Sequence, residues 1–238
     1  PATPAFIIGL TALRSQALTV IDCRVSLGFP ASERVAGNRA AVIEQCTYDG
    51  TIHNAEMILK AIGHLCDYIL FDEAWAGFMK FHPLYAGRFA MGLAELGPEA
   101  PGIIATQSTH KQLASFSQAS QIHMKDRHIT GQKRRVEHRR FNESFMQHAS
   151  TSPFYPLFAS LDVGAQMMKG RSGEVLWDDT IRLGIELRKK IRAVRREFEE
   201  KERRPERRWF FEPFVPDRVA MPDVASPGAV HDVPWESV

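Results

Sequence analysis

The six residues TQSTHK, from Thr106 to Lys111, combine an amine with hydroxyl and imidazole groups. An amine that is to react with an aldehyde must be unprotonated and correctly aimed, so it needs a partly desolvated pocket. Hydroxyl and imidazole groups are suited to phosphate, and Ser108 and His110 lie three and one positions before the lysine. A second motif, DEAW at residues 72–75, supplies a carboxylate. Together the two motifs suit a ligand that carries both an aldehyde and a phosphate.

Pyridoxal 5′-phosphate is the cofactor that needs this set of groups. Its aldehyde condenses with a lysine amine, for which Lys111 is the candidate. Its pyridine nitrogen must stay protonated for the ring to accept electrons, and a buried carboxylate beside that nitrogen raises the pKa of the nitrogen. Asp72 is the candidate for this carboxylate, and Ser108 and His110 are the candidates for the phosphate contacts. The sequence indicates no metal site.

Each of these residues also has an ordinary structural interpretation. A lysine after a histidine is usually a solvated loop residue, and an aspartate after a strand is usually a turn former or a helix N-cap. Trp75 is at least as well explained as a core tryptophan as by a role in a pocket wall. Single residues therefore do not decide the function.

Short apolar segments precede both motifs. Residues 66–71 have the composition of a strand, so Asp72 would stand at a strand's carboxyl end, where open α/β sheets place their ligands. Residues 102–106 form a second expected strand, which would deliver Lys111 just beyond its end. We therefore expect both motifs at one edge of a sheet.

The whole pattern predicts an α/β fold with a mainly parallel sheet and flanking helices. The strand at residues 66–71 follows a strand and a helix, which is the order of a parallel crossover unit. The other expected elements are strands at 5–10, 40–46 and 117–124, turns at 28–30 and 47–50, helices at 54–65, 161–169 (ended by Gly170) and 177–201, and a covering loop with short helices at 76–100.

Composition bounds the class of protein. The chain has 238 residues, of which 44% are hydrophobic, so it can build one sizeable core. A net charge of +2 is too small to indicate nucleic acid. The 3 cysteines show no CxxC spacing, which favours reduced thiols and a cytoplasmic location. No apolar run approaches the roughly 20 residues that span a bilayer, and no basic-then-apolar leader opens the chain. We expect neither nucleic acid nor a membrane as partner.

Residues 125–140 are dense in Lys, Arg and His. A patch for nucleic acid is one interpretation, and a solvated loop or a subunit contact is the other. We favour the second because aromatic side chains for base stacking are not interleaved with the basic ones.

Residues 106–120, TQSTHKQLASFSQAS, resemble the cofactor-attachment motif of the bacterial ornithine/lysine/arginine decarboxylases. These are pyridoxal-phosphate enzymes of fold type I, whose large domain is aspartate-aminotransferase-like. The resemblance covers roughly residues 41–214 and runs in order along the chain. The other matching motifs are CTYDGTIHNAE (46–56), GHLCDYILFDEAWAGF (63–78), FSQASQIHMKD (116–126), FNESFMQHASTSPFYPLFASLDV (141–163) and WFFEPF (209–214).

The resemblance implies a role for several residues of the two motifs. By this resemblance, Lys111 forms the Schiff base with the cofactor and Asp72 pairs with its pyridine nitrogen. The remaining implied contacts are the small residue packed on the ring face, the two phosphate contacts and the pocket wall, which fall on Ala74, Ser108, His110 and Trp75.

The activity implied is decarboxylation of a basic amino acid to putrescine, cadaverine or agmatine. Ornithine is favoured over lysine and arginine because residues 63–72 and 148–163 look closest to the ornithine branch. Two alternatives stay open: another fold-type-I pyridoxal-phosphate enzyme such as an aminotransferase, and an inactive truncated remnant of the decarboxylase. The resemblance also implies a homodimer or a higher homo-oligomer.

Three segments are expected along the chain. Residues 1–40 match no family segment and form a divergent N-terminal stretch. Residues 41–212 correspond to the C-terminal half of the cofactor-binding large domain. Residues 213–238 are rich in proline and are expected to be a linker towards a C-terminal domain that is absent here.

Overall fold

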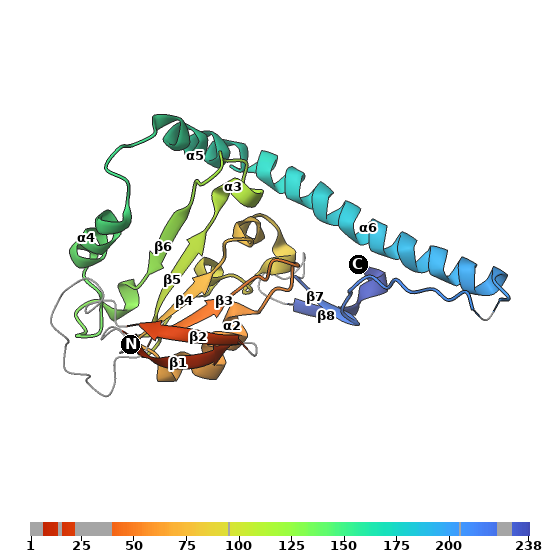
Figure 1. The fold of residues 1–238 in the computed structure, drawn as a ribbon, viewed down its shortest axis with the longest axis horizontal. Coiled ribbons are helices and arrows are strands. Elements are labelled where there is room, and N and C mark those ends of the chain that lie inside the picture. Colours follow the sequence, from red (N-terminus) through yellow and green to blue (C-terminus); the bar gives the residue numbers. More distant parts are fainter. Residues whose placement is uncertain (1–6, 14–15, 22–39, 95, 205, 223–229) are drawn as a thin grey trace, which may run out of the picture. The chain divides into compact units, whose positions relative to one another are not determined.

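A computed structural model describes residues 7–13, 16–21, 40–94, 96–204, 206–222 and 230–238, in two compact units, residues 1–38 and 39–238. In the first unit, β1 (Ile7–Leu13) and β2 (Gln16–Ile21) form an antiparallel hairpin (Figure 1). This hairpin includes the described part of the strand predicted at residues 5–10. The turn predicted at residues 28–30, and Cys23, lie outside the described residues.

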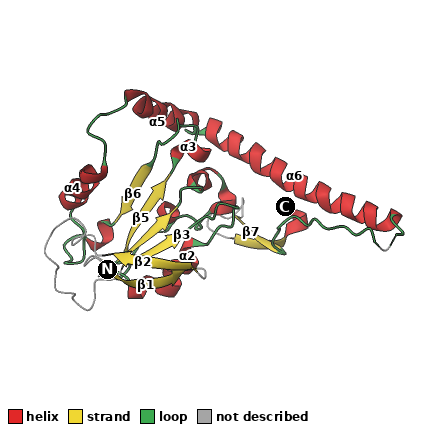
Figure 2. Ribbon diagram, viewed as in Figure 1, coloured by secondary structure: helices red, strands yellow, loops and turns green. Residues whose placement is uncertain are grey.

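The second unit is built on a four-stranded sheet in the order β3-β4-β5-β6 (Figure 2). Its strands are β3 (Ala40–Glu44), β4 (Tyr68–Asp72), β5 (Gly102–Gln107) and β6 (Gln121–Lys125). The first three strands run parallel, and β6 pairs antiparallel with β5. The predicted α/β class and mainly parallel sheet are therefore confirmed.

One face of this sheet carries the hydrophobic core. The helix α2 (Ala55–Ile62) connects β3 to β4, and the Asn54 side chain caps it by accepting a hydrogen bond from the Met57 amide. Side chains that alternate along β4 and β5 point to this face and are fully buried against α2 and the loop that follows β4. The buried core residues are Ala55, Ile69, Phe71, Ala90, Leu93, Ile103 and Ala105.

The opposite face of the sheet is covered less well by the described residues. Val42 in β3 is 61% exposed and Ile122 in β6 is 42% exposed. Both strands lie at the sides of the sheet, and β3 has a neighbouring strand on one side only among the described strands. Asp72 and Thr106 lie in the same row as Ile122, so they share its face.

The described part of the loop between β4 and β5 contains three 3-10 helices, in agreement with the predicted covering loop with short helices. They are η2 (Gly77–Phe81), η3 (Pro83–Tyr85) and η4 (Ala90–Gly92). Ala76, Met79 and Phe89 from this loop pack with Cys46 in a second buried cluster.

The strand predicted at residues 117–124 begins four residues later than expected, at Gln121. Ala114 and Gln118 both have positive φ angles, of 61° and 73°. An extended strand cannot include a left-handed residue, so residues 113–119 form a loop instead. Neither position is a glycine, and the sequence therefore gave no signal of this backbone.

Both long helices begin six residues earlier than predicted. They are α5 (Tyr155–Met167) and α6 (Arg171–Lys201). The first turn of α5 contains a proline, a residue that is favoured in that position because it lacks an amide hydrogen to leave unpaired there. A Cβ atom on Gly173 would lie 2.2 Å from the Met168 carbonyl oxygen, so the first turn of α6 approaches the end of α5 too closely for a side chain.

The predicted basic segment forms a helix and several internal contacts. It includes η5 (Arg127–Ile129) and the start of α4 (His138–His148). Arg135 pairs with the buried Asp126 at 3.3 Å, and Arg134 donates to two backbone carbonyls of the β4–β5 loop. These contacts are those of a folded loop, and the absence of nucleic-acid binding stays a prediction.

The expected linker contains regular structure. The strands β7 (Arg218–Pro222) and β8 (Val230–Pro234) form an antiparallel hairpin, followed by η6 (Trp235–Ser237). Trp235 is buried, and the cationic groups of Lys189 and Arg192 on α6 lie 5.9 and 5.4 Å from its ring centre. The prolines do not interrupt the two strands, because each strand holds its proline at its last position. Proline-rich composition alone therefore did not indicate this hairpin.

Candidate active site

The two predicted motifs meet at one end of the sheet. Asp72, the last residue of β4, lies opposite Thr106 in the neighbouring strand β5. The Glu73 amide continues the pairing by donating to the Thr106 carbonyl at 2.9 Å. Neighbouring strands lie about 4.8 Å apart. The DEAW turn and the TQSTHK turn therefore leave adjacent strands side by side.

Asp72 is held in the first turn after β4. Its Oδ1 accepts a hydrogen bond from the Ala74 amide at 3.0 Å, while the Ala76 amide donates to the Glu73 carbonyl at 2.9 Å. The aspartate is half-buried. Its second oxygen has no hydrogen-bond partner among the described residues, so it is available to a cationic ligand atom.

Lys111 lies in a single turn of helix, α3 (Thr109–Gln112), directly after β5. Its amide donates to the Ser108 carbonyl at 3.2 Å, which fixes the backbone of the turn. The Lys111 Nζ lies 4.3 Å from the centre of the Trp75 ring. Trp75 also meets Tyr48 edge to face at 5.2 Å. The structure therefore brings the lysine of one motif against the tryptophan of the other.

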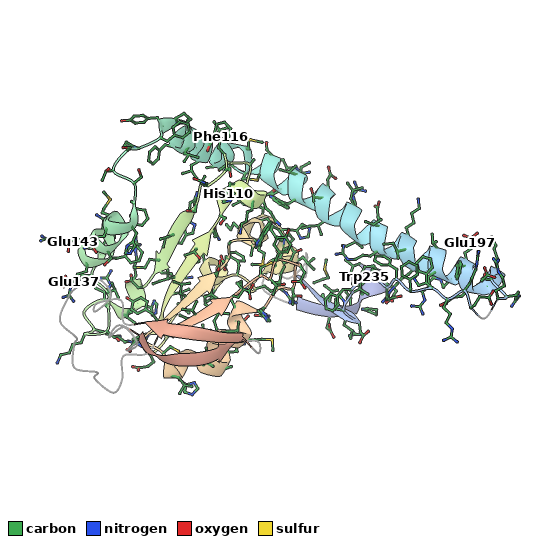
Figure 3. All side chains as sticks on the ribbon, in the orientation of Figure 1. His110, Phe116, Glu137, Glu143, Glu197 and Trp235 are labelled. Atoms are coloured by element: carbon green, nitrogen blue, oxygen red, sulfur yellow. The ribbon has the colours of Figure 1, made fainter. Side chains whose placement is uncertain are left out.

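The two predicted phosphate contacts flank Thr109 in the same turn. Ser108 is half-buried and its side chain makes no capping hydrogen bond to α3. The His110 Nδ1 lies 2.8 Å from the Ala119 carbonyl oxygen, so Nδ1 carries a proton and donates it there. The Nε2 atom is the one that remains for a ligand. Figure 3 labels His110 at the end of β5.

The loop that follows Lys111 is fixed to α5. The Phe116 amide donates to Ser160 Oγ at 3.1 Å, and the Ser115 hydroxyl donates to the Ser160 carbonyl at 3.4 Å. Gly164, one turn further along α5, approaches the Leu113 carbonyl. The lysine turn is therefore supported from β5 on one side and from α5 on the other.

Gly164 gives a testable consequence of this packing. A Cβ atom at this position would lie 2.8 Å from the Leu113 carbonyl oxygen, which is backbone and cannot rotate away. We expect Gly164→Val to displace α5 from the lysine turn and to lower the free energy of unfolding by about 1–3 kcal/mol. Urea denaturation measures this change. Gly184→Val on α6 is the control for helix propensity, because the atom printed near a Cβ there is the far end of the flexible Arg188 side chain, at 3.3 Å. Equal losses in the two variants would contradict the close packing.

The groups present at this strand end fit pyridoxal phosphate. A half-buried amine, a carboxylate with one oxygen available, a hydroxyl and an imidazole occupy two adjacent turns, and Ala74 leaves room beside Asp72. A cavity of about 350 Å³ lies beside the lysine turn and is lined by Gln107, Leu113 and His123, among others, but by none of the six predicted site residues. Burial lowers the pKa of His123.

Comparison with known proteins decides the family. Residues 24–232 match the family model described as "Orn/Lys/Arg decarboxylase, major domain".

The chain belongs to the Orn/Lys/Arg decarboxylase family.

Relatives within this family carry different substrate names. The constitutive ornithine decarboxylase of Escherichia coli is 56% identical over 155 residues, which cover 65% of this chain and 22% of that protein. Lysine decarboxylase LdcA of Pseudomonas aeruginosa is 38% identical over 213 residues, which cover 90% of this chain and 27% of that protein. The solved structure of lysine decarboxylase A from Pseudomonas aeruginosa aligns with a TM-score of 0.63 at 40% identity, covering 78% of this chain and 23% of that one. The chain thus spans about a quarter of the length of these relatives.

Two further residues of the site, Glu73 and Gln107, have no role assigned from the sequence. Glu73 and Gln107 lie within the two motifs, and their side chains are hydrogen-bonded at 2.8 Å. Glu73 is fully buried, and burial raises the pKa of its carboxyl group. The available signal was the acidic residue next to Asp72, but its partner lies 34 positions away along the chain.

The structure describes no helix that is long and apolar enough to cross a membrane. Among the same residues, no cluster of three or more His, Cys, Asp or Glu side chains is arranged for a metal ion.

Proposed function

We propose that this chain belongs to an enzyme that decarboxylates a basic amino acid with pyridoxal 5′-phosphate, with ornithine as the favoured substrate. The observation that carries this proposal is the placement of Lys111 and Asp72 on adjacent turns of neighbouring parallel strands. The family membership supports it, because the relatives are named as ornithine, lysine and arginine decarboxylases.

The cofactor would be held by the six residues of the two motifs. Bound pyridoxal phosphate supplies a protonated ring that accepts the electron pair left behind when carbon dioxide departs. The Lys111 amine would bind the aldehyde carbon, and the available Asp72 oxygen would keep a proton on the ring nitrogen by pairing with it. Ser108 and His110 Nε2 would bind the phosphate, which is nearly a dianion.

Trp75 and Ala74 would shape the space around the reacting atoms. The Trp75 ring already covers the Lys111 amine at 4.3 Å, so it excludes water from one side of that nitrogen. Ala74 presents a small side chain where a flat ring has to approach the sheet.

Identity supports ornithine as the substrate. The match to the Escherichia coli ornithine decarboxylase is 56% identical, whereas the match to the lysine decarboxylase LdcA is 38% identical over a longer stretch. We also propose a homodimer or higher homo-oligomer, acting in the cytoplasm. Burial raises the pKa of the Cys46 thiol, so this cysteine stays protonated and unreactive, in keeping with a reducing compartment.

The proposed function is tested by supplying the chain with pyridoxal phosphate and one amino acid at a time. We expect carbon dioxide and putrescine from ornithine, with cadaverine from lysine and agmatine from arginine formed more slowly. Chromatography of the amines measures this order. Absence of both cofactor uptake and amine product would favour the alternative of an inactive remnant, which the coverage of only 22% of the ornithine decarboxylase allows, whereas a keto acid product would favour an aminotransferase.

A further inference from the structure

Glu73 is a buried carboxylate that the proposed reaction does not use. Its side chain is fully buried, and burial, followed by the charge of Asp72, raises its pKa. Two donors face it: the Ala90 amide at 2.5 Å from Oε1 and the Gln107 side-chain amide at 2.8 Å from Oε2. A carboxylate without donors would be very costly at such a position. Each of its oxygens thus has a defined partner.

The two donors belong to different parts of the site. Gln107 is the last residue of β5 and directly precedes Ser108 in the lysine turn. Ala90 begins η4 in the loop that covers the core. Glu73 itself directly follows Asp72 and begins the turn that the Ala76 amide closes on the Glu73 carbonyl. One carboxylate therefore connects the turn bearing Asp72, the turn bearing Lys111 and the covering loop.

We propose that Glu73 is a positioning residue, which acts through Gln107 to hold the Lys111 turn at a fixed place relative to Asp72 and Trp75. The role in cofactor binding rests on the proposed function. The cofactor ring has a fixed length, so its aldehyde and its ring nitrogen reach Lys111 and Asp72 together only if the two turns keep their separation. The backbone pairing of β4 and β5 ends at Thr106, and the Glu73–Gln107 bond extends it by one side-chain contact.

The donor and the acceptor of the Glu73–Gln107 hydrogen bond can be exchanged while the bond itself is kept. In the variant that combines Glu73→Gln with Gln107→Glu, the new amide oxygen accepts from the Ala90 amide and the new amide nitrogen donates to the new carboxylate. In Gln107→Glu alone, two carboxylates face each other in a buried place, which is strongly unfavourable. The exchanged pair and this single variant have side chains of nearly the same shape. They differ in whether a hydrogen-bond donor or a second carboxylate faces the carboxylate.

The experiment compares four variants in the full chain with two measurements. The variants are Glu73→Ala, Gln107→Ala, Gln107→Glu and the exchanged pair, with Glu143→Ala on the exposed face of α4 as a control for removing an acidic residue. Hydrogen–deuterium exchange of residues 108–113 in cofactor-free protein reports the order of the lysine turn. Titration with pyridoxal 5′-phosphate gives the dissociation constant.

The three single variants at residues 73 and 107 are expected to exchange faster in residues 108–113 and to bind the cofactor about tenfold or more weakly, as for loss of a hydrogen bond to a charged group. The exchanged pair should recover most of both losses.

If instead the exchanged pair binds the cofactor as weakly as Gln107→Glu, or if both alanine variants leave hydrogen–deuterium exchange in residues 108–113 unchanged, the inference is wrong. Should Glu73→Ala fail to fold, the comparison of the exchanged pair with Gln107→Glu decides. Failure of the unaltered chain to bind cofactor would count against the proposed function, while the exchange measurement would still judge the contact.

Discussion

Lys111→Ala is expected to abolish covalent attachment of pyridoxal phosphate and to lower the rate of amine formation by about a thousandfold or more, as for loss of a catalytic nucleophile. The lysine stands in the single turn α3, directly after the strand that pairs with β4. Among the described residues, Lys111 is the lysine whose amine lies over the Trp75 ring, at 4.3 Å from its centre. Lys111→Arg should behave in the same way, because arginine keeps the charge over the ring and supplies no reactive amine.

Borohydride reduction followed by mass spectrometry measures the attachment. The unaltered chain should carry the reduced cofactor on the peptide that contains Lys111, and both variants should carry none there. Lys60→Ala is the control, because Lys60 is exposed on α2 and pairs with Glu56 on the same helix. Undiminished amine formation by Lys111→Ala would defeat the assignment of this lysine.

Asp72→Asn separates cofactor attachment from the reaction. The amide oxygen of asparagine can still accept from the Ala74 amide, so the turn after β4 is expected to keep its conformation. The side chain loses its negative charge, however, and no longer holds a proton on the ring nitrogen. We expect the cofactor to attach to Lys111 as before, while the turnover number falls by about 100-fold or more through weaker electrostatic stabilisation.

The two quantities are measured on the same samples, by borohydride trapping and by amine formation under saturating substrate. Asp179→Asn is the control, because Asp179 is exposed on α6 and pairs with Arg182. Equal turnover in Asp72→Asn and in the unaltered chain would show that this carboxylate does not support the ring. Loss of trapping together with turnover would instead indicate a binding role.

The strand ends could be predicted from the sequence because their signals are local. Short apolar runs end at Asp72 and shortly before Lys111, and adjacent parallel strands then bring these ends together. The cap at Asn54 and the turn at Thr47, where the Gly50 amide donates to the Thr47 carbonyl, are local in the same way. Family resemblance added the chemical roles to these positions.

The support of the site could not be predicted, because it depends on contacts between distant residues. Glu73 meets Ala90 and Gln107, which lie 17 and 34 positions away, and Ser160 holds a loop that lies 44 positions earlier. The left-handed backbone at Ala114 and Gln118 has no marker, since glycine is absent from both. The periodicity of apolar residues indicates one helix or strand at a time and does not indicate which distant residues contact each other.

The unpaired side of β3 has a practical consequence. Among the described strands, β3 has a neighbour on one side, so the amides and carbonyls on its other side are a template on which an extended segment of another chain can add, and the exposed Val42 lies in this strand. We therefore expect concentrated preparations of this polypeptide to be prone to intermolecular β-sheet growth, and a charged side chain in place of Val42 to discourage it without touching the buried face.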